Sequence, residues 1–192
     1  MVRSEVSIPY GDHLDEIGIS SEQLFDGYML KAWRDGVKLP DGSESVREYI
    51  RHQGACVIIP ELRPGVFVME RQFRYPIGRP MVEFPAGKLD PDETELACAQ
   101  RELLEETGYR AGRWQHIATL HPCIAYSSER IEVFLAQDLQ FEGQRLDPGE
   151  FLDVFEMTIE DAEQGVLDGL ITDAKTISCL FWARKILQTG RT

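Results

Sequence analysis

The sequence predicts an α+β protein in which helices flank a mixed β-sheet. Short apolar runs rich in β-branched and aromatic residues fill much of the chain before Phe84. After Asp90 the apolar residues recur with the period of a helix, and strand-like runs then return before two further helical stretches. Helices and strands that alternate in this way bury their apolar faces by packing as helices on a sheet.

The first expected strands are Leu24–Val37 and Ser45–His52, on either side of a turn at Leu39-Pro-Asp-Gly-Ser43. We therefore expect residues 1–52 to form a small N-terminal antiparallel β region, and residues 53–192 to form the main domain. Within the latter, the expected strands are Ala55–Pro60, Val66–Phe73, Met81–Phe84, Trp114–Leu120, Arg130–Ala136 and Phe151–Met157.

A helix is expected over Asp90–Thr107, with Asp90 as its N-cap, Pro91 at its first position and Gly108 ending it. Its apolar face would carry Leu96, Ala99 and Leu103. A second helix is expected to begin at Thr158, with Asp161 as its capping-box partner. A third is expected over Asp173–Leu187.

Composition limits the function classes. The 192 residues suit one domain with a small appendage, and the net charge of −13 argues against nucleic acid or an anionic membrane as a partner. No apolar run approaches the roughly 20 residues of a membrane span, and the start of the chain has no signal-peptide pattern. No pair of the four cysteines has C-x-x-C spacing, so reduced thiols and a cytoplasmic location are expected.

Three carboxylates cluster late in the first expected helix. Glu102, Glu105 and Glu106 would share an arc of roughly 100° within one turn. Like charges at this spacing destabilise a helix, and the negative end of the helix dipole adds to the cost. Only Arg101 is a nearby counter-charge. A bound Mg²⁺ would remove both penalties, but a solvated acidic face is equally compatible with these residues alone.

The full spacing from Gly87 to Tyr109 matches G-x5-E-x7-R-E-U-x-E-E-x-G-U, where U is a bulky apolar residue. This segment resembles the signature of the Nudix hydrolase superfamily, although Tyr109 stands where an aliphatic residue is usual. The resemblance implies an α/β/α sandwich with mixed sheets that hydrolyses a nucleoside diphosphate linked to another group, using Mg²⁺ with Mn²⁺ as a substitute.

The resemblance also implies a role for each residue of this segment. Glu102 and Glu106 look like the principal metal ligands, with Glu105 and the backbone carbonyl of Ala86 as further ligands. The residues that look structural, because they orient the ligands or let the chain pass close to the metal, are Gly87, Glu93 and Arg101.

Segments outside this signature are similar to ADP-ribose pyrophosphatases over roughly residues 24–187. They are Arg71-Gln-Phe-Arg-Tyr-Pro76, Val82–Asp90, Ser128–Ala136 and Gly149–Val154. The loop His121–Ser127 departs from the subgroup pattern. This likeness implies hydrolysis of ADP-ribose to AMP and ribose 5-phosphate, and a homodimer formed through the N-terminal region.

Within that subgroup Arg74 resembles an arginine that contacts the diphosphate, and Glu83 is expected to reach the metal or the substrate. Glu150 resembles the catalytic base, with Asp147 and the signature glutamates, including Glu105, as alternatives. Arg51 and Tyr28 are expected near the substrate. The aromatic residues that could stack on adenine, or pack in the core or a dimer interface instead, are Phe25, Tyr28 and Trp33.

Two other functions stay open. The signature handles the diphosphate and not the groups at its ends, so the substrate could be another nucleoside diphosphate sugar such as GDP-mannose. The chain could also be a non-catalytic sensor that binds ADP-ribose. Sensors of this kind tend to lose signature glutamates, and this chain retains all three.

Overall fold

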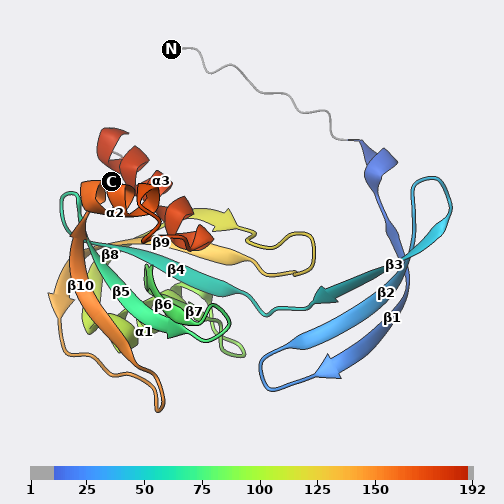
Figure 1. The fold of residues 1–192 in the computed structure, drawn as a ribbon, viewed down its shortest axis with the longest axis horizontal. Coiled ribbons are helices and arrows are strands. Elements are labelled where there is room, and N and C mark those ends of the chain that lie inside the picture. The colour runs from blue at the N-terminus through green and yellow to red at the C-terminus, as the bar shows by residue number, and fades with distance from the viewer. Residues whose placement is uncertain (1–10, 190–192) are drawn as a thin grey trace. The chain divides into compact units, whose positions relative to one another are not determined.

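The structure, a computed structural model, describes residues 11–189 (Figure 1). Within them the chain forms two compact units. The first runs to His52 and takes in Ala125–Ser128, and the second comprises Gln53–Ile124 and the chain from Glu129. Residues 1–10 and 190–192 of the two predicted regions lie outside the described residues. No helix between residues 11 and 189 is long and apolar enough to cross a membrane.

The N-terminal unit is a three-stranded antiparallel sheet in the order β1-β2-β3. A short 3-10 helix precedes it, and the elements are η1 (Asp12–Leu14), β1 (Ile17–Asp26), β2 (Lys31–Lys38) and β3 (Glu44–Ile50). The prediction of one strand over Leu24–Val37 was wrong, because the chain turns between β1 and β2. The Gly27 N–H donates to the Leu30 carbonyl at 2.9 Å and closes this turn.

The main unit is built on a seven-stranded mixed sheet. Its backbone order is β10-β5-β4-β9-β8, with β6 paired to β5 and β7 paired to β4. The β4–β9 pair is parallel and all other pairs are antiparallel. The strands are β4 (Ala55–Arg63), β5 (Val66–Arg74), β6 (Arg79–Glu83), β7 (Ala86–Lys88), β8 (Tyr109–Leu120), β9 (Ile131–Phe141) and β10 (Leu152–Thr158).

Helices cover both faces of this sheet (Figure 1). They are α1 (Glu95–Thr107), α2 (Ile159–Leu167) and α3 (Ala174–Thr189). Successive side chains of a strand point to opposite faces. On β4, Val57 and Ile59 pack in a core with α2 and α3, whereas Cys56 and Ile58 pack in a second core with α1. This three-layer arrangement confirms the predicted α/β/α sandwich.

Helix α1 begins later than predicted. Its N-cap is Thr94, whose Oγ1 accepts the Ala97 N–H at 3.3 Å, so the prediction of Asp90 as the cap was wrong. The Asp90 N–H instead donates to the Glu93 carboxylate at 3.0 Å, which holds this stretch in a turn. The predicted C-terminal end is confirmed, because Gly108 adopts φ 76° and donates its N–H to the Leu104 carbonyl.

The other two helices begin where the sequence indicates. Thr158 caps α2, accepting the Asp161 N–H at 3.1 Å and donating its hydroxyl to the Asp161 carboxylate at 2.7 Å. At the start of α3 the Asp173 carboxylate accepts the Thr176 N–H at 3.0 Å. The second cap fixes Asp173 close to the sheet, where it takes part in the charge network described below.

Candidate active site

Strand β7 and the last turn of α1 are joined directly. The Glu106 side chain is buried, and its Oε2 accepts the Ala86 N–H at 3.0 Å. The structure therefore brings together two of the predicted metal ligands, the Glu106 carboxylate and the backbone of Ala86. Burial, followed by the charges of nearby glutamates, raises the pKa of Glu106 well above its usual value.

Arg101 hydrogen-bonds to acidic side chains of α1 and of the turn that precedes it. Its guanidinium donates to both carboxylate oxygens of Glu93 at 2.9 Å, to Glu102 at 2.8 Å and to Glu105 at 3.1 Å. It also donates to the Lys88 carbonyl at 3.2 Å, which ties α1 to β7. The hydrogen bond to Glu93 is the main reason that the pKa of Arg101 is raised. The predicted structural pair, Arg101 and Glu93, is therefore in contact.

Gly87 lies against the Glu102 carboxylate. A Cβ atom built on Gly87 would lie 1.7 Å from Oε1 of Glu102 and 1.9 Å from its Cδ. No side chain fits there unless Glu102 moves. Glycine at this position therefore provides the space in which the Glu102 carboxylate lies.

Glu70 on β5 was missed by the sequence interpretation. Its side chain is fully buried, and neither carboxylate oxygen has a hydrogen-bond partner among residues 11–189. Burial, followed by the charge of Glu83, raises the pKa of Glu70 to about 8. The signal available in the sequence was a single acidic residue directly after the apolar run Val66–Met69.

Four carboxylates from separate elements interact electrostatically. Glu106 responds to the charges of Glu70, Glu102 and Glu150, and burial raises the pKa of Glu102 as well. These residues come from β5, α1 and the loop before β10. Besides burial, the charge of Glu150, the predicted base, thus raises the pKa of two signature glutamates, Glu102 and Glu106.

These residues fit a hard divalent cation. Among residues 11–189 no three acidic, histidine or cysteine side chains already converge as a coordination shell, since Arg101 holds Glu102 and Glu105. Yet the buried oxygens of Glu70 lack any donor, and buried polar groups are nearly always satisfied. Carboxylate and carbonyl oxygens are the ligands that Mg²⁺, Mn²⁺ and Ca²⁺ prefer.

Glu150 is oriented by two donors. Its Oε1 accepts from Nε2 of Gln72 at 3.3 Å, and its Oε2 lies 3.4 Å from the Asp147 backbone nitrogen, which donates to it. Gln72 is two residues beyond Glu70 on β5, so the two side chains share one face of the sheet. The structure thus places the Glu150 carboxylate beside that face, while Asp147 contributes its backbone to holding it.

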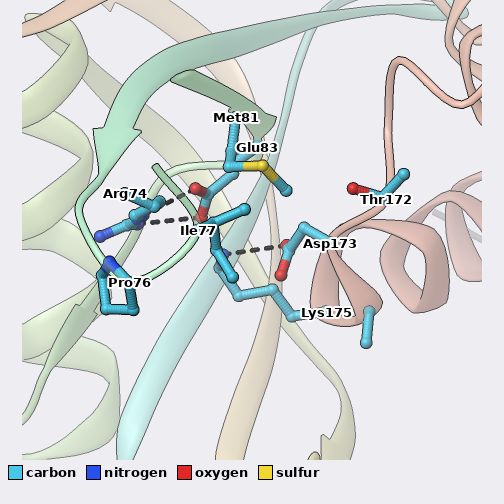
Figure 2. A pocket seen from close by; sticks show the side chains of 9 residues that line it. Arg74, Pro76, Ile77, Met81, Glu83, Thr172, Asp173 and Lys175 are labelled. Atoms are coloured by element: carbon cyan, nitrogen blue, oxygen red, sulfur yellow. Dashed lines mark hydrogen bonds and ion pairs between the residues drawn. The ribbon is translucent and has the colours of Figure 1, made fainter. Parts of the chain in front are cut away.

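A second charged cluster surrounds Glu83 (Figure 2). The Arg74 guanidinium donates two hydrogen bonds to this carboxylate, from Nε to Oε1 at 2.7 Å and from Nη2 to Oε2 at 2.9 Å. Lys175, which the sequence interpretation missed, donates to Glu83 and to Asp173, the latter at 2.9 Å. Although burial opposes it, the hydrogen bond from Arg74 and the charge of Lys175 lower the pKa of Glu83.

This cluster lines a hollow beside the start of α3 (Figure 2). The lining residues are Arg74, Pro76, Ile77, Met81, Glu83, Thr172, Asp173, Ala174 and Lys175. Arg74 is partly exposed there, whereas Glu83 is almost entirely buried beneath it. The Arg74 guanidinium is therefore held by the buried Glu83 carboxylate and remains partly open to solvent.

In the N-terminal unit, Arg51 packs on an aromatic side chain. Its guanidinium carbon lies 3.7 Å from the centre of the Trp33 ring, and its Nη2 donates to the Tyr49 hydroxyl at 2.7 Å. Tyr28 is fully exposed at the turn between β1 and β2. Contacts of Arg51 and Tyr28 with substrate stay predictions.

Replacing Gly87 with alanine is expected to weaken binding of Mn²⁺ by about tenfold or more, because the added methyl group displaces the Glu102 carboxylate. The matched control is Gly18→Ala, where a Cβ meets nothing within 4 Å. Mn²⁺ affinity measured by electron paramagnetic resonance checks this. An affinity in Gly87→Ala equal to that of the control would contradict it.

The NUDIX domain family matches residues 50–178. An ADP-ribose pyrophosphatase of Bacillus subtilis (strain 168) is 39% identical over 165 residues, which cover 85% of this chain and 89% of that protein. A GDP-mannose pyrophosphatase of Cronobacter sakazakii (strain ATCC BAA-894) is 34% identical over 143 residues, covering 69% and 73% respectively.

The fold also superposes on the crystal structure of an ADP compounds hydrolase. The TM-score is 0.83, with 23% identity, and the match covers 93% of this chain and 97% of that one. This likeness supports the fold. The match to residues 50–178 and the 39% identical relative show that the chain belongs to the Nudix domain family.

Proposed function

We propose that this protein hydrolyses the diphosphate bond of ADP-ribose, or of a related ADP-sugar, giving AMP and ribose 5-phosphate in the case of ADP-ribose. The observation that carries the proposal is the hydrogen bond between the buried Glu106 carboxylate at the end of α1 and the Ala86 N–H on β7, on the sheet face where the carboxylate of Glu70 is also buried. The ADP-ribose pyrophosphatase relative, 39% identical over most of both chains, supports the choice of substrate.

Mg²⁺, for which Mn²⁺ would substitute, is the proposed cofactor. The residues that would hold it are Glu102, Glu105, Glu106 and the backbone carbonyl of Ala86. When bound, such an ion neutralises charge on the diphosphate and makes a water molecule easier to deprotonate. It would also meet an anionic substrate that the net charge of −13 would otherwise repel.

In the proposed reaction, water adds to one phosphorus of the diphosphate, and its proton passes to the Glu150 carboxylate. The bond from that phosphorus to the bridging oxygen breaks, and the bridging oxygen leaves with the other phosphate. Gln72 and the Asp147 N–H would keep Glu150 oriented as the acceptor. Glu105 is the alternative acceptor, since it is partly exposed on α1.

Arg74 is proposed to hold the diphosphate. A guanidinium fork suits phosphate oxygens, and Arg74 presents its open side to the hollow while Glu83 fixes it from beneath. In this arrangement Glu83 acts by positioning Arg74. A direct contact of Glu83 with metal or substrate requires release of both Arg74 and Lys175.

A homodimer formed through residues 1–52 is also proposed. Every residue of β1 is exposed, and the large apolar side chains among them are Ile17, Ile19, Leu24 and Phe25. An exposed apolar surface of this kind is typical of an interface. We further propose that Arg51 and Tyr28 of this region contact the substrate, that the protein acts in the cytoplasm, and that neither nucleic acid nor membrane is a partner.

GDP-mannose is the second candidate substrate, and the 34% identical GDP-mannose pyrophosphatase favours keeping it. A non-catalytic sensor is disfavoured, because Glu102, Glu105, Glu106 and Glu150 are all present.

A screen of nucleoside diphosphate sugars with Mg²⁺ and a coupled phosphatase is expected to show the highest kcat/KM for ADP-ribose. The measurement is release of inorganic phosphate from the products, with chelator-treated enzyme as the control. Faster turnover of GDP-mannose than of ADP-ribose would refute the substrate assignment.

Glu106→Gln is expected to lower turnover by about 100-fold at ordinary Mg²⁺ concentrations, because a buried ligand of the ion loses its charge. The measurement is kcat as a function of Mg²⁺ concentration. Glu142→Gln, which removes an exposed carboxylate paired with Arg110, is the control and should be near wild type. Wild-type kcat for Glu106→Gln at saturating Mg²⁺ would show that Glu106 does not hold the ion.

Glu150→Gln is expected to lower kcat by about 100-fold with little change in Mg²⁺ affinity, because the amide cannot accept the proton from water. Steady-state kinetics beside Asp147→Asn separate the two candidates. A near-normal kcat for Glu150→Gln with a large loss for Asp147→Asn would move the role to Asp147.

A further inference from the structure

Glu70 has no compensation for its burial. It lies on β5 between β6 and β10, where Glu83 and Val154 are its paired neighbours. Neither of its carboxylate oxygens is exposed or hydrogen-bonded within the described residues. Burying a carboxyl group without a partner costs several kcal/mol on the order-of-magnitude scale for polar transfer. The described part of the chain supplies no donor or positive charge in contact with the Glu70 carboxylate.

The nearest acidic neighbour makes the burial harder. Glu83 lies directly opposite Glu70 in the β5–β6 ladder, and like charges in such pairs are destabilising. Arg74 and Lys175 both hydrogen-bond to Glu83 and leave Glu70 with none of their donors. Glu83 is therefore satisfied by the chain itself, whereas Glu70 is not.

The strand pattern shows which way Glu70 points. Phe67 and Met69 pack in the core formed with α2 and α3, so the alternate residues Glu70 and Gln72 lie on the opposite face, which α1 covers. On that face Gln72 holds Glu150. Glu106 is buried at the end of α1, the helix that packs on this face, and is held there by the Ala86 N–H. Glu70 thus faces the carboxylates proposed to hold the ion.

We propose that Glu70 is a further carboxylate ligand of the divalent cation, reaching it from the sheet while Glu102 and Glu106 reach it from α1. The inference rests on the proposed function for the existence of the ion at this site. An ion between β5 and α1 would supply the positive charge that Glu70 and Glu106 both lack. Hard cations accept several carboxylate oxygens from different elements in this way.

The test compares Glu70→Gln, which keeps the side-chain shape, with wild type by Mn²⁺ titration and by thermal unfolding with and without Mn²⁺. Loss of a ligand is expected to weaken Mn²⁺ binding by about tenfold or more. The gain in Tm on adding Mn²⁺ should shrink correspondingly. Without the ion, Glu70→Gln should unfold at the wild-type temperature or above it, because the variant removes the cost of burying an ionisable group that has no partner.

Glu132→Gln is the matched control. Glu132 is also a buried glutamate in the main sheet, but its carboxylate accepts from Thr119 at 2.7 Å and pairs with His116 at 2.7 Å. This variant should lose thermal stability equally with and without Mn²⁺, and should keep wild-type affinity for the ion. Glu70→Asp, which retains the charge, should recover part of the affinity lost in Glu70→Gln.

Mn²⁺ affinity in Glu70→Gln within twofold of wild type would overturn the inference, as would a wild-type protein that binds no Mn²⁺. Hydrolysis of ADP-ribose by the wild-type protein is measured separately. Failure of that activity with a weakened ion affinity in Glu70→Gln would reject the proposed function and support Glu70 as a ligand. Normal activity with unchanged affinity would reject only the role of Glu70.

Discussion

Buried negative charge on the α1 face of the main sheet is the constraint on which the site depends. Glu70, Glu102 and Glu106 come from two elements, and burial makes the charged form of each one costly. Arg101 offsets part of this cost by donating hydrogen bonds to Glu93, Glu102 and Glu105. Glu106 receives only a backbone N–H, and Glu70 receives nothing. The uncompensated remainder lies where the proposed cation would bind.

Under the proposed function, the two charged clusters have different roles in binding an anion. Arg74 and Lys175 beside α3 are paired with the carboxylates of Glu83 and Asp173, which hold the two cations in place. The acidic cluster beside β7 becomes attractive to phosphate only through a bound ion. A protein with a net charge of −13 can then bind a diphosphate, because the local field at the site and not the overall charge decides the contact.

The sequence predicted the architecture, because it depends on local pattern, and the same kind of pattern singled out the proposed site residues of α1. The α1 spacing was sufficient to single out Glu102, Glu105 and Glu106, and the alternation of apolar residues was sufficient for the main strands. The N-cap of α1 was predicted at Asp90 but lies at Thr94, whose hydroxyl accepts the Ala97 N–H. The Asp90 N–H instead bonds to the Glu93 carboxylate, so the chain before Thr94 forms a turn. Strand β1 was missed because all of its residues are exposed and show no alternation.

Glu70 and Lys175 were beyond sequence reasoning for a different cause. The surroundings of each residue depend on another element of the chain. Glu70 on β5 lies opposite Glu83 on β6. Lys175, at the start of α3, donates to the same Glu83. A single acidic residue in a strand could equally lie at an exposed edge. Only the register of β5 with β6 and β10 shows that Glu70 is enclosed.

The Arg101 network has a consequence for the order of folding and ion uptake. Because one guanidinium already ties β7 to α1 through the Lys88 carbonyl and three carboxylates, the segment that carries the ligands is held together by the chain's own charges. In small zinc domains the metal itself drives folding. Here the scaffold is held together by Arg101, and an ion at the proposed site would compete with Arg101 for Glu102 and Glu105. Ion uptake would then be an exchange of electrostatic partners within a folded protein.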